Sequence, residues 1–261
     1  MRHVKHLTNI SKRSILEAIG LFRAPLALAQ APAYNSRMMH ASRSPHSAED
    51  WRENAYDLAR GLAAYSGSRL AEGIARVIAR HPDAKIANAF NHKQVGCKIW
   101  ARDKLFDSVG ASCRRVVVLG GWYGILPAML LEDPRFDIEA ADSYDIDPAV
   151  APVASTLNAA FGDRFHAVTA DMHALDYRSL NADLVINTSC EHIADLGNWL
   201  GLIPTGTRVL LQSNNYFSEP THISCVPSLD EFRARAGLAR VDFAGALPMN
   251  NYTRFMLIGT V

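Results

Sequence analysis

The sequence predicts an α/β fold in which a doubly wound, mainly parallel seven-stranded sheet follows an N-terminal helical cap. Residues 51–110 carry apolar side chains at helical spacing, whereas strand-like and helix-like segments alternate from residue 111 to residue 261. The β-branched run at 116–119 breaks into glycines and restarts as a helix, which is typical of the first strand–turn–helix unit of such a sheet. Helices between the strands provide the crossover connections that parallel neighbours require.

The cap is predicted over residues 46–110 and contains three helical segments. In the first two, apolar residues recur on one face, and His81-Pro82-Asp83 ends the second segment. The third segment, 91–110, ends at Gly110 and leads into the first strand. The two apolar faces consist of Trp51, Ala55, Leu58, Ala59 and Leu62, and of Leu70, Ile74, Val77 and Ile78.

The α/β domain is predicted over residues 111–261, with each element justified by its apolar pattern and its flanking turn residues. After the first strand, helices are expected at 125–133, 148–162, 191–202 and 228–237. Strands are expected at 136–144, 166–171, 182–189, 207–214, 240–247 and 252–261. In a sheet of this kind the ligand crevice lies at the carboxyl ends of the strands, so the residues just past each strand are the candidates for a site.

Residues 1–45 differ from the rest because they contain seven Lys/Arg and one acid, Glu17. A basic, acid-poor leader is typical of a transit peptide. The interpretation we favour is a basic, mobile or loosely docked extension.

The composition indicates a globular protein with a small-molecule substrate. The 261 residues are 49% hydrophobic, and 27 Lys+Arg balance 26 Asp+Glu, so we expect no nucleic-acid partner. No stretch approaches the roughly 20 apolar residues of a membrane span, so we expect no membrane partner. The four cysteines are far apart and form no C-x-x-C pair, so we expect no metal site and a reducing, cytoplasmic location. The sequence leaves open whether the protein forms a homodimer.

The glycine loop after the first strand contains Gly120, Gly121, Trp122 and Gly124. Such a turn leaves backbone N–H groups free at a helix N-terminus, where an anion or a nucleotide can bind. Its spacing is not the G-x-G-x-x-G of dinucleotide-binding folds, which argues against a nucleotide-dependent reductase.

Acidic residues follow the next two strands. Asp145, with Ile146 beside it, is assigned to a ribose, and Asp147 is assigned to capping the helix that Pro148 opens, although either acid fits the cap. Asp171 can accept from an adenine amine while Met172 lies against the ring. Asp171 fits equally as a turn residue.

The succession VVVLGGWYG, YDIDP, TADM, ADLVINTSCEHI, TGTRVLLQS and HISCVPSLDEF resembles class I S-adenosylmethionine-dependent methyltransferases over residues 115–261. The Glu191-His192 pair and the later His222 are similar to small-molecule methyltransferases of the ubiquinone-biosynthesis type. The resemblance implies a Rossmann-like fold, S-adenosyl-L-methionine as cofactor and a small-molecule methyl acceptor. The cofactor-binding residues it implies are Gly120, Gly121, Trp122, Gly124, Asp145, Ile146, Asp171, Met172 and Asn187.

The loop departs from the family pattern G-x-G-x-G because Trp122 stands at the middle glycine. We therefore expect a remodelled loop. With the segment from Gln94 to Trp100, the GGWYG loop resembles a divergent, phage- and bacteria-associated branch of methyltransferase-like proteins. That branch implies no substrate.

The candidate catalytic residues are Asn187, Ser189, His192 and Tyr123. Asn187 can donate to and accept from a nucleophile, or satisfy its own turn. His192 can take a proton, or pack with Leu196 on one helix face as a structural residue. We expect Tyr123 to face the sulfonium through its ring and Trp122 to pack between cap and sheet.

Two further kinds of function remain open. An enzyme can use the same cofactor for cyclisation or elimination on its aminobutyrate arm, releasing methylthioadenosine, and the altered loop favours this alternative. A binding or scaffold protein would hold the cofactor without turnover. The sequence names no substrate, because residues 51–110 contain no readable motif for one.

Overall fold

The computed structural model describes residues 48–261, and the predictions for residues 1–45 lie outside the described residues. Residues 46–261 form one compact unit, so the cap and the sheet belong to the same body. None of the described helices is both long and apolar enough to cross a membrane.

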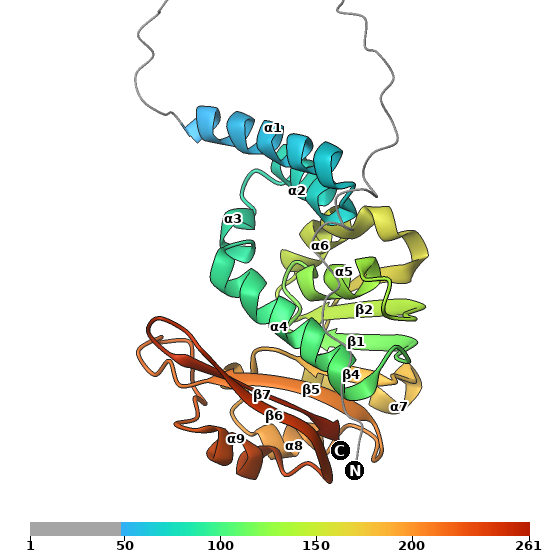
Figure 1. Cartoon of the computed structure of the whole chain (residues 1–261), viewed down its shortest axis with the longest axis vertical. Helices are drawn as coiled ribbons and strands as arrows, with labels where there is room; N and C mark the ends of the chain where they lie inside the picture. Colours follow the sequence, from blue (N-terminus) through green and yellow to red (C-terminus); the bar gives the residue numbers. More distant parts are fainter. Residues whose placement is uncertain (1–47) are drawn as a thin grey trace, which may run out of the picture. The chain divides into compact units, whose positions relative to one another are not determined.

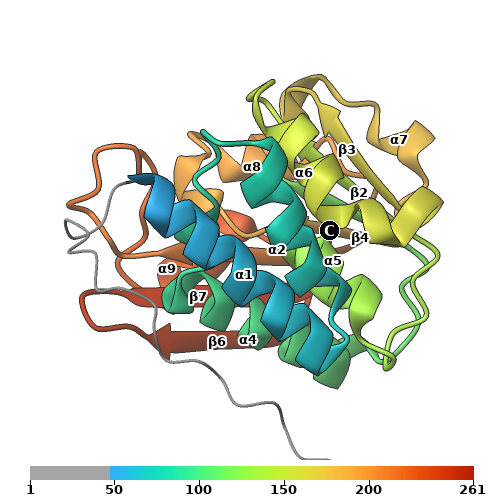
Figure 2. The same cartoon turned by 90° about the horizontal axis from the view of Figure 1, so that it is seen from above.

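The sheet has seven strands in the order β3-β2-β1-β4-β5-β7-β6; Figure 1 labels β1, β2 and β4 to β7, and Figure 2 labels β3. Strands β1 to β5 run parallel, and β7 pairs antiparallel with both β5 and β6. The predicted mainly parallel seven-stranded sheet is therefore confirmed. The strands are β1 (Arg115–Leu119), β2 (Ala140–Asp145), β3 (Phe165–Thr169), β4 (Leu184–Asn187), β5 (Arg208–Asn214), β6 (Arg240–Pro248) and β7 (Thr253–Thr260).

The helices of the cap precede β1, and the others alternate with the strands (Figures 1 and 2). The cap consists of α1 (Ala48–Ser66), α2 (Arg69–Arg80), α3 (Ile86–Ala89) and α4 (His92–Val109). The later helices are α5 (Ile125–Glu132), α6 (Val150–Asn158), α7 (Tyr177–Leu180), α8 (Leu196–Leu200) and α9 (Leu229–Ala236). Short 3-10 turns are η1 (Ala159–Arg164), η2 (Met172–Ala174) and η3 (Cys190–His192).

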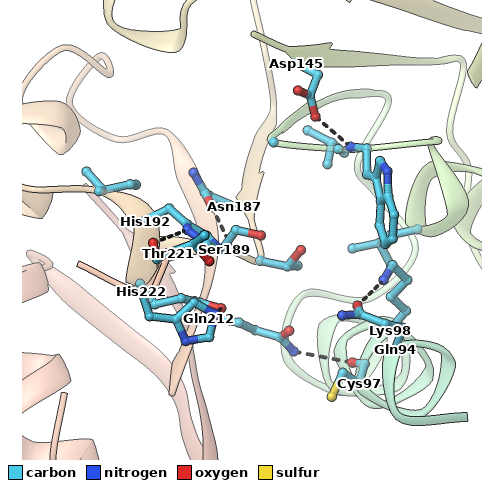
Figure 3. A pocket seen from close by; sticks show the side chains of 18 of the residues that line it. Gln94, Cys97, Lys98, Asp145, Asn187, Ser189, His192, Gln212, Thr221 and His222 are labelled. Carbon is cyan, nitrogen blue, oxygen red and sulfur yellow. Dashed lines mark hydrogen bonds and ion pairs between the residues drawn. The ribbon is translucent and has the colours of Figure 1, made fainter. Parts of the chain in front are cut away.

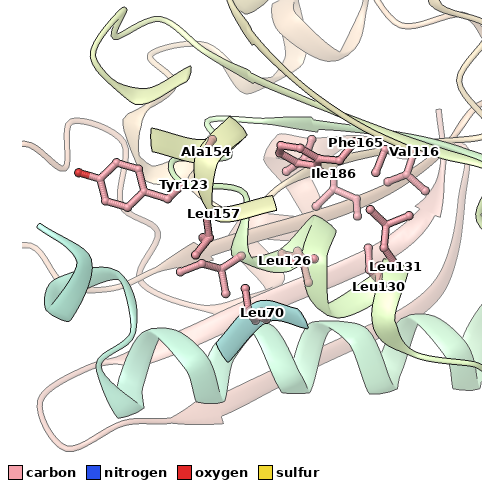
Figure 4. Packing of buried hydrophobic residues seen from close by; sticks show 14 of the residues in the cluster. Leu70, Val116, Tyr123, Leu126, Leu130, Leu131, Ala154, Leu157, Phe165 and Ile186 are labelled. Carbon is pink, nitrogen blue, oxygen red and sulfur yellow. The ribbon is translucent and has the colours of Figure 1, made fainter. Parts of the chain in front are cut away.

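Strand β1 separates two hydrophobic cores because successive side chains of a strand point to opposite faces. Val116 and Val118 join the core formed with α2, α4, α5 and α6, part of which Figure 4 shows. Val117 and Leu119 join the core formed with α8 and α9. Apolar burial on both faces explains why this strand is a continuous β-branched run.

Close backbone contact joins the cap to the sheet domain. A Cβ placed on Gly73 of α2 would lie 2.0 Å from the carbonyl oxygen of Leu157 in α6, so only glycine fits this crossing. At the start of α2, the Glu132 carboxylate at the end of α5 accepts from the backbone N–H of Arg69 at 2.6 Å. Within the cap, α2 therefore packs closely on α5 and α6.

The prediction of one continuous helix over residues 191–202 is wrong. The structure has the turn η3, which ends at His192, and then the short helix α8 from Leu196. Asp195 interrupts the helix because its carboxylate accepts from the backbone N–H of Asn198 and caps α8. His192 and Leu196 consequently do not share a helix face.

Candidate active site

A cavity of about 830 Å³ opens where the parallel strands end. It lies beside the switch point between β1 and β4, where an open α/β sheet binds its ligand. Its volume falls in the range of roughly 300–1,000 Å³ that small-molecule pockets occupy. In Figure 3, Asp145, Gln94 and Lys98 lie on one side of the pocket, and His192 and His222 lie on the other.

The glycine loop folds around three left-handed residues. Gly120, Trp122 and Gly124 have φ values of 58°, 48° and 71°. A Cβ on Gly121 would lie 2.1 Å from Oγ of Ser143, so the loop runs close against β2. At the middle position of the loop, Trp122 itself has a positive φ, which is unusual for a bulky residue.

The structure does not place Tyr123 in the pocket as expected, whereas Trp122 packs against the core shared by cap and sheet as expected and also lines the pocket. Trp122 lines the pocket, whereas Tyr123 is 7% exposed and belongs to the core beneath the cap (Figure 4). The Tyr123 hydroxyl accepts from the backbone N–H of Lys85 at 3.2 Å, which fixes the ring away from the cavity. The two rings lie against each other, with centroids 5.1 Å apart and planes at 32°, and of the two only Trp122 also lines the pocket.

Asp145, at the end of β2, holds the loop with its carboxylate. Its Oδ2 accepts from the backbone N–H of Trp122 at 3.0 Å, and its Oδ1 accepts from the backbone N–H of Asp147 at 3.1 Å. Each carboxylate oxygen has a second lone pair for a ligand hydroxyl. Asp147 turns the chain toward α6, since its Oδ1 accepts from the backbone N–H of Ala149 at 2.9 Å.

The next strand ends add an apolar and amide surface to the cavity. Ile146 is 69% exposed, and Met172 is half-buried, both in the pocket wall. Exposed Asp171 accepts from the backbone N–H of His173 at 2.9 Å. Buried Asn187 accepts from the backbone N–H of Ser189 at 2.8 Å, and its amide lies 3.7 Å from the sulfur of Met172.

The structure brings most of the sequence-predicted site residues to one pocket. Ser189 lines it between Asn187 and His192. Gly124 and Tyr123 lie outside the lining. Gly124 serves the loop instead, because its left-handed φ begins α5 and a Cβ there would meet the ring of Phe165 at 2.7 Å. The lining residues predicted from the sequence are Gly120, Gly121, Trp122, Asp145, Ile146, Asp171, Met172, Asn187, Ser189 and His192.

The cap contributes a cationic group that the sequence analysis did not assign. Lys98 of α4 lines the pocket and donates to the Gln94 side chain at 2.9 Å. Burial, with the nearby positive charge of Arg254, lowers the pKa of Lys98 to about 8. Helix periodicity alone does not separate a pocket-facing lysine from a solvated one, so this residue had no distinguishing signal.

A buried ion pair lies at the far side of the pocket. Glu191 and Arg254 are 3% and 8% exposed, with 3.4 Å between Oε1 of the carboxylate and Nη2 of the guanidinium. Arg254 also donates to the carbonyl of Thr188 at 2.9 Å. The lone arginine within the apolar run of β7 is the signal that could have identified it, because a buried charge needs a partner.

Two histidines flank this carboxylate. Nδ1 of His192 lies 2.9 Å from the carbonyl oxygen of Thr221, and Nε2 of His222 lies 3.9 Å from Oε1 of Glu191. The two imidazole rings meet edge to face with centroids 4.9 Å apart. Residues from η3 and from the loop after β5 thus form one polar cluster in the pocket.

Solved structures share the fold of this chain. No protein-family model and no curated protein matches the sequence. The N-methyltransferase NodS from Bradyrhizobium japonicum WM9, in complex with S-adenosyl-L-homocysteine, superposes with a TM-score of 0.53 and 8% identity over 74% of this chain and 98% of NodS. A Galdieria sulphuraria protein described as a sarcosine dimethylglycine methyltransferase has a TM-score of 0.51 and 11% identity over 64% of this chain and 86% of its own. The described part of the chain therefore has a Rossmann-like methyltransferase fold.

Proposed function

We propose that the protein is an S-adenosyl-L-methionine-dependent methyltransferase that acts on a small molecule. The observation that carries the proposal is the convergence of the left-handed loop at Trp122 with Asp145 and Asp171 in one pocket. A nucleoside offers two ribose hydroxyls and an adenine amine, and acids at successive strand ends accept from such donors. NodS, which shares the fold, is crystallised with S-adenosyl-L-homocysteine.

The pocket also suits the remaining parts of this cofactor. Ile146 and Met172 provide apolar surface for the adenine ring, and covering Ile146 removes an exposed aliphatic side chain from water. The ammonium group of Lys98 provides a positive charge for the carboxylate of the methionine arm. The indole of Trp122 presents a π face, which attracts a sulfonium.

Methyl transfer is an in-line displacement that mainly requires orientation and exclusion of water. The nucleophile of the acceptor would approach from the side of His192, Ser189 and Glu191 and attack the methyl carbon while the carbon–sulfur bond breaks. Asn187, which is fixed by its bond to Ser189, lies between the two halves of the pocket (Figure 3). The pocket is suited to a small acceptor because its volume must hold both reactants.

Calorimetric titration with S-adenosyl-L-methionine and with S-adenosyl-L-homocysteine tests the cofactor. We expect both to bind and to change the protein fluorescence, because Trp122 lines the pocket. NADH is the control ligand, and tighter binding of NADH would contradict the proposal.

The product identifies the chemistry. Incubation with S-adenosyl-L-methionine and a panel of small hydroxyl and amine compounds should release S-adenosylhomocysteine. Release of methylthioadenosine instead would indicate attack on the aminobutyrate arm. Binding without turnover on any acceptor would indicate a binding protein.

A further inference from the structure

Helix α1 turns its small side chains inward and its large apolar side chains outward. The core takes Ala55 and Ala59 from this helix, and the Arg52 guanidinium donates to the carbonyl of Ile78 in α2 at 2.8 Å. Figures 1 and 2 show α1 as the outermost helix of the cap, on the side of α2 away from the sheet. The apolar face that the sequence predicts for this helix is therefore only partly buried, since its alanines pack inward and its larger residues do not.

Four large apolar side chains form an exposed stripe along this helix, here called the α1 stripe. Their spacing of seven, four and three residues places them on one side of the helix. Because a large apolar side chain has about 150–250 Å² of surface, the stripe exposes roughly 500 Å² to solvent. The largest apolar patch of a typical monomer is about 300–600 Å² and often marks an interaction site. The residues of the α1 stripe are Trp51 (52% exposed), Leu58 (64%), Leu62 (52%) and Tyr65 (92%).

The charges of α1 lie away from the stripe. Between residues 51 and 66 the exposed charged side chains are Glu53, Asp57 and Arg60. At about 100° per residue they point roughly 180–240° around the helix from Trp51, which is the opposite side. A helix that binds an anionic membrane surface carries many Lys and Arg residues on its polar face. Two acids and one arginine do not provide such a face, so the stripe is suited to another protein surface.

The α1 stripe is complementary to itself under a twofold rotation. Trp51 and Tyr65 each lie seven residues from Leu58, so an antiparallel second helix centred on Leu58 brings each Trp51 against a Tyr65. The same rotation brings Ala55 opposite Gly61, and a Cβ on Gly61 would meet nothing within 4 Å in one copy. The distance between two packed helices depends on the side chains at their contact, so this small pair allows close approach. Aromatic rings then pack at both ends of the contact.

We propose that the α1 stripe binds the α1 stripe of a second copy of this chain, antiparallel and about a twofold axis near Leu58. Two stripes together bury roughly 1,000 Å², which reaches the lower limit of about 1,000 Å² for a specific interface. Such a twofold contact is the commonest symmetry of soluble homo-oligomers. An interface of this size is reversible, so the fraction of dimer rises with protein concentration. No residue of α1 lines the pocket, so this inference does not rest on the proposed function.

Sedimentation velocity of the full chain over a range of concentrations tests the dimer. Leu58→Glu places two like charges together at the axis, so the dissociation constant of the dimer should rise at least about a hundredfold. Leu202→Glu is the matched control, because Leu202 is also an exposed leucine but lies outside α1. This control variant should dimerise like the wild type. A full chain that stays monomeric at every concentration overturns the proposal, and so does a Leu58→Glu protein that dimerises normally.

Cysteine cross-linking of the full chain tests the direction of the pairing, because the native cysteines of the described chain are all buried. Leu58→Cys should form a disulfide between two copies under mild oxidation, since the axis brings the two positions together. Trp51→Cys should not cross-link to itself, because at about 1.5 Å per residue its two copies lie about 21 Å apart along the helices. A mixture of Trp51→Cys and Tyr65→Cys chains should cross-link. Self-linking of Trp51→Cys would contradict the antiparallel arrangement, as would Glu53→Cys chains that link as readily as Leu58→Cys chains.

A lipid surface is the other occupant that the experiments distinguish. Vesicles of phosphatidylcholine and phosphatidylserine are sedimented with the full chain and with the Leu58→Glu variant. We expect neither protein to sediment with the vesicles, because the exposed charges of α1 include two acids and one arginine. Cosedimentation of the wild type that Leu58→Glu abolishes would assign the α1 stripe to a membrane surface and overturn the proposal.

Discussion

The backbone N–H of Trp122 donates to Oδ2 of Asp145 at 3.0 Å, and this bond holds Trp122 at a φ of 48°. A left-handed bulky residue costs roughly 1–3 kcal/mol, which the surrounding contacts must offset. The Asp145 carboxylate thus shapes the loop in addition to facing the pocket.

Replacing the Trp122 ring should reduce binding of the charged cofactor selectively. Trp122→Leu removes the π face, so the affinity for S-adenosyl-L-methionine should fall about twofold to thirtyfold, corresponding to roughly 0.5–2 kcal/mol. The affinity for neutral S-adenosyl-L-homocysteine should change little. Calorimetry with both ligands measures the ratio, and equal weakening would indicate lost packing instead.

Tyr123→Leu is the control for that experiment because Tyr123 packs in the core. It should lower the free energy of unfolding by about 1–3 kcal/mol and leave the ratio of the two affinities unchanged. A charge-selective loss in Tyr123→Leu would contradict the register of the loop.

Removing the charge of Asp145 should weaken cofactor binding. Asp145→Asn keeps the shape and one acceptor oxygen, so the loss should be on the order of 1.5–3 kcal/mol from charge-assisted bonds to the ribose. Asp183→Asn is the matched control, since Asp183 also accepts a backbone N–H, that of Arg115, but lies outside the pocket. If a folded Asp145→Asn protein bound the cofactor with wild-type affinity, the ribose would not bind at Asp145.

Lys98 should make stability depend on pH. Its pKa of about 8 in the folded protein lies below its ordinary value of 10.5, so between these values the unfolded chain binds more protons. The contribution of Lys98 to the free energy of unfolding therefore rises with pH between about 8 and 10.5. Below pH 8 the cost of burying its charge is present in full. Lys98→Met should stabilise the protein by up to about 3 kcal/mol at pH 7.

Urea unfolding of wild type and Lys98→Met at several pH values measures this difference. The gap between the two proteins should shrink as pH rises through the stated window. A gap that is constant from pH 7 to pH 10.5 would show that Lys98 is not buried as a charge.

The α2–α6 crossing should tolerate no side chain at its closest point. Gly73→Ala places a Cβ against the Leu157 carbonyl, which must shift, so we expect a loss of about 1–3 kcal/mol in thermal or urea unfolding. Gly61→Ala in α1 has open space and should instead stabilise the helix by up to about 1 kcal/mol. Equal effects of the two substitutions would contradict the close packing of the cap.

The cofactor pocket should be complete in a chain that begins at Ser47. Its lining residues lie between Asn91 and Arg254, and residues 46–261 form one compact unit. The shortened chain should fold and bind S-adenosyl-L-homocysteine with unchanged affinity, as measured by calorimetry. Aggregation or a lost affinity would show that residues 1–45 contribute to the fold or to the pocket.

The sequence by itself determined the order of the strands and helices and the sheet edge at which the site lies. Apolar periodicity and turn residues are local signals, and parallel strands bring residues such as Asp145, Asp171 and Asn187 to one edge whatever the details of packing. The wrong prediction of one helix over residues 191–202 also has a local cause. Asp195 fits a helix pattern in the sequence, and only its capping bond in the structure shows that a new helix begins there.

Only the tertiary structure decided which side chains enter the pocket. Trp122 and Tyr123 are adjacent and chemically alike, and their rings contact each other, yet only Trp122 lines the cavity while Tyr123 is buried in the core. The polar cluster beside Glu191 likewise joins His192 to His222, which are 30 residues apart in the chain. Such contacts depend on strand pairing and loop geometry, which bring together residues that no spacing in the chain relates.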